Sequence, residues 1–218
     1  GHYHSYIWLY YMTRFPGMPI RVFNGGIGGD TAYDMNKRLD GDIFAMKPSV
    51  LMVTFGMNDS GYFEYNGDKP KEFGEQKYQE SIKNYQQMEK RFKDLPDTRI
   101  VMVGTSPYDE TVQLKENTPF KIKNETIKRL VEYQKESAAK NNWEFTDLNA
   151  PMTAINQQYQ QKDPTFTLCG SDRIHPDNDG HMVMAYLFLK AQGFVGKEVA
   201  DMEINANKKQ AVKAENCT

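Results

Sequence analysis

The sequence predicts an α/β protein with a parallel sheet covered on both faces, and two patterns support this. Four short apolar segments bounded by turn residues have strand character, at residues 20–23, 50–55, 99–104 and 144–148. Longer segments between them carry an apolar residue every three or four positions, which is typical of amphipathic helices. In a chain of 218 residues this alternation favours one α/β domain that binds ligands at the carboxyl ends of its strands.

The helices are predicted from the same periodicity. The first covers residues 32–46, and Thr31 with Asp34 three residues later resembles a capping box at its start. The second covers residues 78–92, the third residues 121–141, and the last runs from residue 177 or 178 to about 192. We expect residues 61–74, which are rich in Gly, Pro and charge, to form a surface loop.

The composition argues against two classes of function. The chain has 27 Lys and Arg residues against 29 Asp and Glu residues, a formal charge of −2, so we expect no nucleic-acid groove. No run of about 18 apolar residues occurs, so we expect no membrane span. The hydrophobic periodicity stops after residue 193. We therefore expect residues 194–218 to be a tail that leads into a further segment.

A run of glycines follows the first predicted strand, where residues 24–31 read Asn-Gly-Gly-Ile-Gly-Gly-Asp-Thr. Glycine allows a tight turn and exposes N–H groups at the start of the next helix, which suits a phosphate or an oxyanion. The dinucleotide fingerprint fails because Thr31 replaces its third glycine, and no Lys-Ser/Thr pair completes a P-loop. A plain strand-to-helix turn is an equally good interpretation.

A second polar turn, with Gly56, Asn58 and Asp59, follows the second predicted strand. At the carboxyl end of a strand, an Asn side chain can donate its amide N–H to a developing negative charge. An ordinary Asn-Asp turn is the simpler interpretation of this segment taken alone.

Asp172 and His175 precede the last predicted helix and are followed by Pro176. Their spacing lets the carboxylate reach Nδ1 of the imidazole, which fixes the tautomer and leaves Nε2 available as a base. A histidine in a surface turn is the alternative. We expect no metal site, because Asp172, His175, Asp177 and Asp179 give no clear three-ligand set at a known spacing.

Together the three turns resemble the SGNH (GDSL-like) hydrolases. Three blocks of that family are matched by residues 24–31, by Gly56 with Asn58 and Asp59, and by Asp172 with His175. The resemblance covers residues 1–193. It implies a serine ester hydrolase, lipase- or acylhydrolase-like, on a three-layer α/β/α fold similar to flavodoxin, with no cofactor.

The resemblance also implies roles for individual residues. His175 would be the general base and Asp172 its orienting carboxylate. The backbone N–H of Gly29 and the side-chain amide of Asn58 would be two of three oxyanion donors. Supporting positions in the same turns are Asn24, Gly56 and Asp59.

The family's first block, Gly-Asp-Ser, supplies the nucleophile, and this sequence contains no such tripeptide. Residues 1–12 resemble the helix that follows that block, so we expect the serine to lie upstream and this chain alone to be inactive. Ser5, Ser60, Ser106 and Ser171 are candidates by residue type. None of them sits on a strand-to-helix elbow ahead of the glycine run.

We therefore expect residues 1–193 to form an SGNH hydrolase-like domain without its first strand, which lies inside a doubly wound sheet. The edge left open invites pairing with another chain, so we expect self-association, which sedimentation would show as dimers or larger species.

The expected substrate is a small-molecule ester or an acylated carbohydrate, such as an acetylated sugar. The sugar preference rests on aromatic residues near the expected cleft, which also serve as ordinary packing residues. A non-catalytic carbohydrate- or ligand-binding module on the same fold is the alternative, and a phosphate- or nucleotide-binding flavodoxin-like domain is a third hypothesis. The many Tyr and Asn residues would fit an exported enzyme, periplasmic or extracellular.

Overall fold

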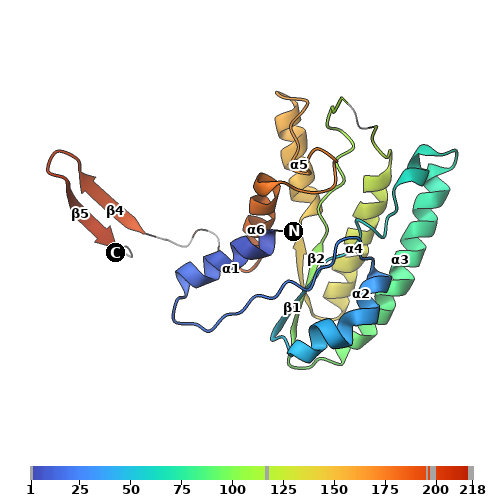
Figure 1. Ribbon diagram of the computed structural model, residues 1–218, viewed down its shortest axis with the longest axis horizontal. Helices are drawn as coiled ribbons and strands as arrows, with labels where there is room; N and C mark the ends of the chain where they lie inside the picture. The colour runs from blue at the N-terminus through green and yellow to red at the C-terminus, as the bar shows by residue number, and fades with distance from the viewer. Residues whose placement is uncertain (1, 116–117, 195, 197–199, 216–218) are drawn as a thin grey trace.

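The computed structural model of the chain describes residues 2–115, 118–194, 196 and 200–215. Its central sheet has three parallel strands in the order β1 (Val50–Val53), β2 (Arg99–Gly104) and β3 (Glu144–Asp147) (Figure 1). The register runs from Val50 opposite Arg99, and from Val101 opposite Glu144. The prediction of a parallel sheet is confirmed, and three of the four predicted strands are present.

Helices cover both faces of this sheet (Figure 1). One face carries α2 (Ala32–Arg38), α3 (Pro70–Lys93) and α4 (Lys123–Lys140), and the other carries α1 (Tyr3–Arg14), α5 (Asn149–Gln160) and α6 (Asn178–Ala191).

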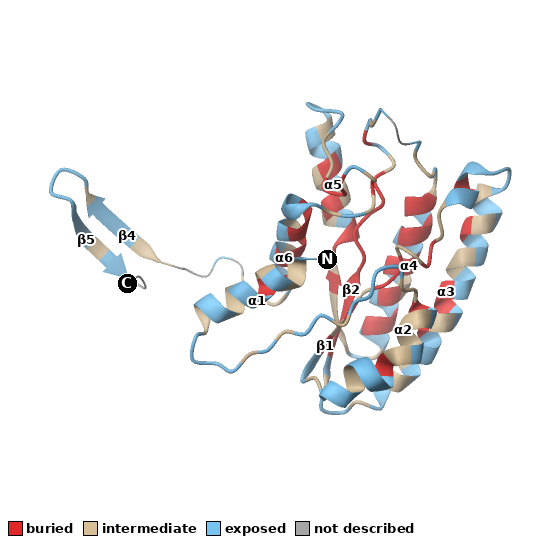
Figure 2. Cartoon of the chain, viewed as in Figure 1, coloured by how far each residue is buried: buried red, intermediate tan, exposed pale blue. Residues whose placement is uncertain are grey.

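The side chains of β2 explain why both faces are covered. Ile100 and Met102 belong to the apolar cluster under α2 and α3, whereas Val101 and Val103 belong to the cluster under α1, α5 and α6. Successive side chains of a strand point to opposite faces, so an uninterrupted apolar strand requires a layer on each side. Figure 2 shows the buried residues along β2 and on the sheet-facing sides of the helices.

Two predicted boundaries differ from the structure. The predicted helix over residues 32–46 is present as α2, a π-helical turn (Leu39–Ile43) and a 3-10 turn (Phe44–Met46). The predicted loop over residues 61–74 contains a 3-10 turn, η3 (Phe63–Asn66), and the start of α3. The helix begins at Pro70 because proline is favoured at the first helical position, where no backbone N–H is needed.

The predicted strand at residues 20–23 is wrong. The segment has no strand assignment and pairs with no strand among the described residues, and Phe23 is 64% exposed. A strand is stabilised by hydrogen bonds to a neighbouring strand, and an apolar pattern does not by itself provide that neighbouring strand. β1 is an edge strand within the described part of the chain, and the expected self-association through this edge stays a prediction.

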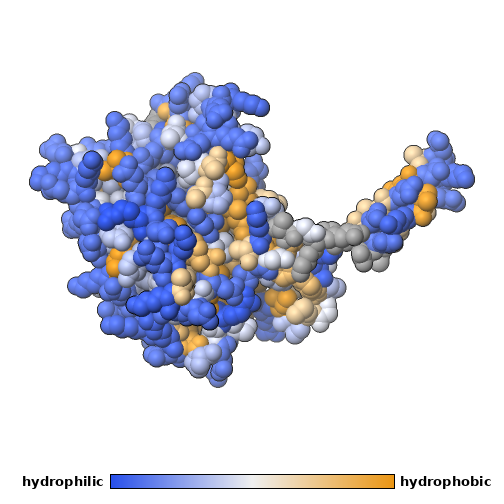
Figure 3. Space-filling view, turned by 180° about the vertical axis from the view of Figure 1, so that it is seen from behind, coloured by the Kyte–Doolittle hydropathy of each residue, from blue (hydrophilic) through white to orange (hydrophobic). Residues whose placement is uncertain are grey.

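A helix and a two-stranded hairpin lie where the sequence periodicity predicts no element. Residues 149–160 are rich in Gln and Asn, yet they form α5, whose Met152 and Ile155 pack into the second apolar cluster. Beyond residue 193, β4 (Asp201–Asn205) and β5 (Gln210–Glu215) form an antiparallel hairpin that lies away from the three layers (Figure 1). Its apolar side chains are exposed (Figure 3). The division of the chain near residue 193 stays a prediction.

None of the helices in the described ranges has the length and apolar character needed to cross a membrane.

Candidate active site

Three loops meet at the carboxyl end of the sheet. The loop of residues 24–31 leads into α2, the loop of residues 54–61 follows β1, and the loop of residues 170–177 leads into α6. Met57 in the second loop and Ile174 in the third pack against the same buried cluster around Tyr108. The fold therefore brings together turns that are far apart in the sequence, at the sheet edge where α/β proteins bind ligands.

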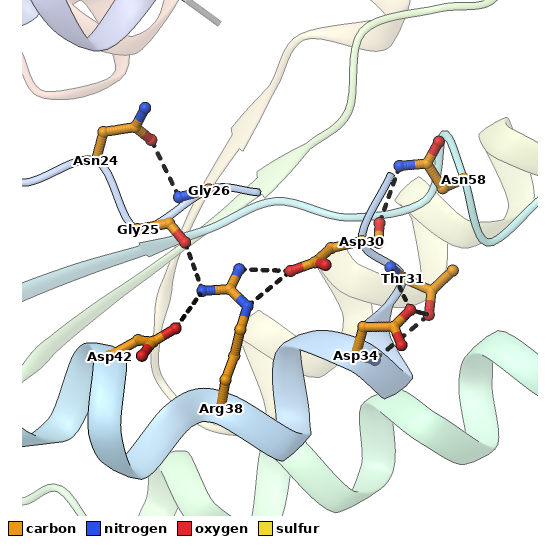
Figure 4. A network of polar contacts seen from close by, with 9 residues as sticks. All are labelled: Asn24, Gly25, Gly26, Asp30, Thr31, Asp34, Arg38, Asp42 and Asn58. Atoms are coloured by element: carbon orange, nitrogen blue, oxygen red, sulfur yellow. Dashed lines mark hydrogen bonds and ion pairs between the residues drawn. The ribbon is translucent and has the colours of Figure 1, made fainter. Parts of the chain in front are cut away.

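The glycine loop is held by its own polar residues (Figure 4). Asn24 Oδ1 accepts a hydrogen bond from the Gly26 N–H at 3.0 Å. Gly29 has a φ of 89°, a left-handed conformation that glycine adopts without steric cost. Thr31 and Asp34 exchange side-chain to backbone hydrogen bonds at the start of α2, so the predicted capping box is confirmed.

Arg38 on α2 ties the two ends of this loop together, and the sequence patterns do not identify it. Its guanidinium donates to the carbonyl oxygen of Gly25 and to the carboxylate of Asp30, both at 2.7 Å, and to Asp42 at 3.2 Å (Figure 4). The Arg38 side chain is only 18% exposed. A planar guanidinium bridges several acceptors at fixed angles, which a lysine cannot do.

Asn58 connects the second loop to the first. Its Nδ2 donates to the backbone carbonyl of Asp30 at 2.9 Å (Figure 4), and its Oδ1 accepts a hydrogen bond from the Tyr62 hydroxyl. The two contacts fix the orientation of the amide. Nδ2 has two N–H groups, and Asp30 takes one of them.

Asp59 is the buried link between three elements. Its Oδ1 accepts from the Ala32 N–H at 2.9 Å and from the Ser81 hydroxyl at 3.1 Å, and its Oδ2 accepts from the Gly56 N–H at 3.0 Å. Burial raises the pKa of Asp59, and these hydrogen bonds oppose the rise. The carboxyl group therefore joins the start of α2, the turn after β1 and the body of α3.

Asp172 and His175 make the contact that their spacing predicts. Asp172 Oδ2 lies 2.6 Å from His175 Nδ1, and Asp172 Oδ1 accepts from the backbone N–H groups of Ile174 and His175, both at 2.9 Å. Burial raises the pKa of Asp172, but these hydrogen bonds outweigh it and hold the pKa below its ordinary value. An ionised carboxylate at this position favours the imidazole tautomer that has its proton on Nδ1 and its lone pair on Nε2.

Arg173 anchors this loop, although nothing in the sequence distinguishes it from a surface arginine. It is 2% exposed and has a φ of 70°. Its guanidinium donates to the carbonyl oxygens of Asp109 at 3.1 Å and Val112 at 2.7 Å, and its own carbonyl accepts from the Asp109 N–H at 3.1 Å. These bonds hold the loop with Asp172 and His175 against the segment that follows β2.

Tyr62 lies between the second and third loops. Burial, together with the negative charges of Asp172 and Asp59, raises the pKa of Tyr62 to about 12. The phenol therefore keeps its proton and remains a donor to Asn58.

A hollow beside His175 is lined by residues from the starts of α1 and α6, including His2, Asn178 and His181. The ring of His2 meets that of His181 edge-on, with centroids 5.6 Å apart, and Tyr3 stacks on His181 at 6.4 Å. Burial lowers the pKa of His181 to about 4, so this imidazole is neutral near pH 7. The start of α1 thus lies next to His175.

The serines of the chain differ in accessibility. Ser60 is fully buried, donates to the carbonyl of Met57 at 2.9 Å and accepts from Lys123, and Ser106 is 6% exposed. Ser5 and Ser171 are exposed, Ser5 within α1 and Ser171 directly before Asp172. No cluster of three or more His, Cys, Asp or Glu side chains suited to a metal ion occurs in the described ranges.

The parallel strands with helices on both faces form an α/β/α architecture. Residues 5–183 match the GDSL-like Lipase/Acylhydrolase family, and the chain belongs to this family, the SGNH hydrolases.

Known proteins of similar sequence and structure are esterases and a drug-metabolising enzyme. An acetylxylan esterase from Geobacillus stearothermophilus is 28% identical over 181 residues, which cover 83% of this chain and 75% of that protein. A solved structure of a gut microbial diltiazem-metabolizing enzyme is 84% identical with a TM-score of 0.93; the match covers all of this chain but 49% of the other. The chain thus spans about half the length of that enzyme.

A structure of the Geobacillus stearothermophilus esterase supports the fold assignment. It is 24% identical with a TM-score of 0.68, and the match covers 88% of this chain and 81% of the esterase.

Proposed function

We propose that the intact protein hydrolyses small-acyl esters and that this chain supplies every part of the active site except the nucleophile. His175 is the general base, Asp172 orients it, and the Gly29 N–H and the Asn58 amide are oxyanion donors. The observation that carries this proposal is the 2.6 Å contact of Asp172 with His175 Nδ1 on an imidazole that is 81% exposed. An exposed and oriented base fits proton transfer better than a structural role.

The proposed chemistry uses these groups in turn. A serine hydroxyl attacks the acyl carbonyl while Nε2 of His175 takes its proton, and the imidazolium then protonates the leaving alcohol. The carbonyl oxygen becomes negative in the tetrahedral intermediate, where the Gly29 N–H and the second Nδ2 N–H of Asn58 stabilise it. Water then releases the acyl group by the same steps.

We place the nucleophilic serine in a segment that precedes α1 in the intact protein. His2 and His175 line one hollow, so a residue shortly before α1 would be near the imidazole. Catalytic mutants of the Geobacillus stearothermophilus esterase replace a Ser, an Asp and a His, the last two three residues apart as in this chain. Burial argues against Ser60 and Ser106.

The proposed substrates carry acetyl or similarly small acyl groups. The two relatives are named for acetylxylan and for diltiazem. Both compounds are acetate esters. For a carbohydrate ester we propose contacts with aromatic rings such as Trp8, which is 44% exposed on α1.

Hydrolysis of p-nitrophenyl acetate tests the proposal. We expect turnover by the intact protein and its loss in the His175→Ala variant, with no turnover by the chain of residues 1–218 alone. Turnover by that chain that disappears with His175→Ala would contradict the placement of the serine. An intact protein that hydrolyses no ester would contradict the proposed function and favour a binding module.

A further inference from the structure

Lys123 is the first residue of α4 and is completely buried. Its ammonium donates to the carbonyl oxygen of Met57 at 2.8 Å, to the hydroxyl of Ser60 at 2.6 Å and to the carbonyl oxygen of Gly61. An ammonium has three N–H donors, so all three are used. Every acceptor belongs to the turn of residues 57–61, which carries Asn58.

A second contact leads from Lys123 to the amide of Asn58. Nζ lies 4.0 Å from the centroid of the Tyr62 ring, whose hydroxyl donates to Asn58 Oδ1. A cation over an aromatic face is attracted by the ring quadrupole. It also withdraws electron density from the phenol, which makes the O–H a stronger donor to the amide.

The ammonium has no carboxylate in direct contact among the described residues. The charged groups that face it are Asp59, from the turn after β1, and Glu110, from the segment after β2, and both raise its pKa. The rings of Tyr62 and Tyr108 complete its surroundings, with Tyr108 at 5.9 Å. Burial outweighs the carboxylates and lowers the pKa of Lys123 to about 7.

We propose that Lys123 is a positioning residue that sets the orientation and donor strength of the Asn58 amide through the turn of residues 57–61 and the Tyr62 phenol. The effect of Lys123 on catalysis rests on the function proposed above, in which the Asn58 amide stabilises the oxyanion. The geometry behind this role is that all three acceptors of Lys123 lie in the turn that carries Asn58, and that Nζ lies over the ring whose hydroxyl bonds to Asn58.

NMR of the chain of residues 1–218 tests the coupling without any need for activity. We expect the side-chain amide resonances of Asn58 to shift with pH at the same midpoint as the Lys123 side chain. In Tyr62→Phe, Lys123 should still titrate while the response of Asn58 becomes smaller. In Lys123→Met the pH-dependent shift of the Asn58 amide resonances should disappear. In Lys135→Met, which removes an exposed lysine of α4, this shift should remain.

If the Asn58 amide resonances of the unchanged chain do not shift as Lys123 titrates, the proposal is overturned. This result does not depend on whether Lys123→Met folds. A response that persists in Lys123→Met would also overturn it.

In the intact enzyme we expect Lys123→Met and Tyr62→Phe to lower kcat by about tenfold or more with little change in KM, because an oxyanion donor acts in the transition state. A change in KM alone would contradict the positioning role. An unchanged kcat in Asn58→Ala would instead contradict the proposed function. The coupling between Lys123 and the Asn58 amide would then be tested by the NMR titration alone.

Discussion

Asp172→Asn in the intact enzyme should lower kcat by about 10⁴-fold, the size of the loss seen for this change in a Ser-His-Asp triad. The carboxylate accepts the Nδ1 proton of His175 at 2.6 Å and leaves Nε2 free. An asparagine can turn its NH₂ group toward Nδ1, which places the proton on Nε2 and removes the base. Stopped assays of p-nitrophenyl acetate hydrolysis would measure the loss.

Asp163→Asn is the matched control for this change. Asp163 lies in the turn after α5, where its carboxylate accepts from the Thr165 N–H at 2.9 Å, and an asparagine oxygen can accept the same bond. We expect near-normal activity from this variant. If Asp172→Asn were as active as Asp163→Asn, the proposed pairing of Asp172 with a catalytic His175 would be wrong.

Asn58→Ala should lower kcat by about 10²- to 10³-fold, or about 2.7–4 kcal/mol of transition-state stabilisation, with a small change in KM. The substitution removes an N–H donor whose direction is fixed by Asp30 and Tyr62. The loss falls on kcat because charge develops on the oxygen only after the serine attacks. Steady-state kinetics with an aryl acetate separate the two parameters.

Asn66→Ala, at the exposed end of η3, is the control for Asn58→Ala. It should leave kcat unchanged. Thermal unfolding of both variants checks that a lower kcat does not come from unfolding, since Asn58 also bonds the glycine loop. A folded Asn58→Ala protein with normal kcat would exclude this amide as an oxyanion donor.

The sheet and most helices could be predicted because they depend on local patterns. β1 and β2 follow from apolar runs, and the start of α2 follows from the spacing of Thr31 and Asp34. The wrong strand at residues 20–23 shows the limit of such patterns, since a strand also depends on a neighbour that its own residues do not specify. The helix α5 is not predicted for a related reason: its polar composition conceals the few apolar residues that pack against the sheet.

Some residues of the candidate site could be predicted from the sequence and others could not. The glycine loop, Asn58 and the pair of Asp172 and His175 are found from short spacings. Lys123 and Arg173 are not, because their bonds join residues more than sixty positions apart. Such long-range contacts leave no periodicity or motif in the sequence, and each of these residues reads alone as an ordinary surface cation.

The central claim is that this chain provides the base and the oxyanion donors for a serine that precedes α1. Labelling of the intact protein with a fluorophosphonate, followed by peptide mapping, tests it most directly. The serine oxygen displaces fluoride from phosphorus with His175 taking the proton, so labelling requires an activated serine. We predict one label, on a serine upstream of residue 1, and its loss in the His175→Ala variant. A label on Ser5 or Ser171, or labelling that is unaffected by His175→Ala, would contradict the account.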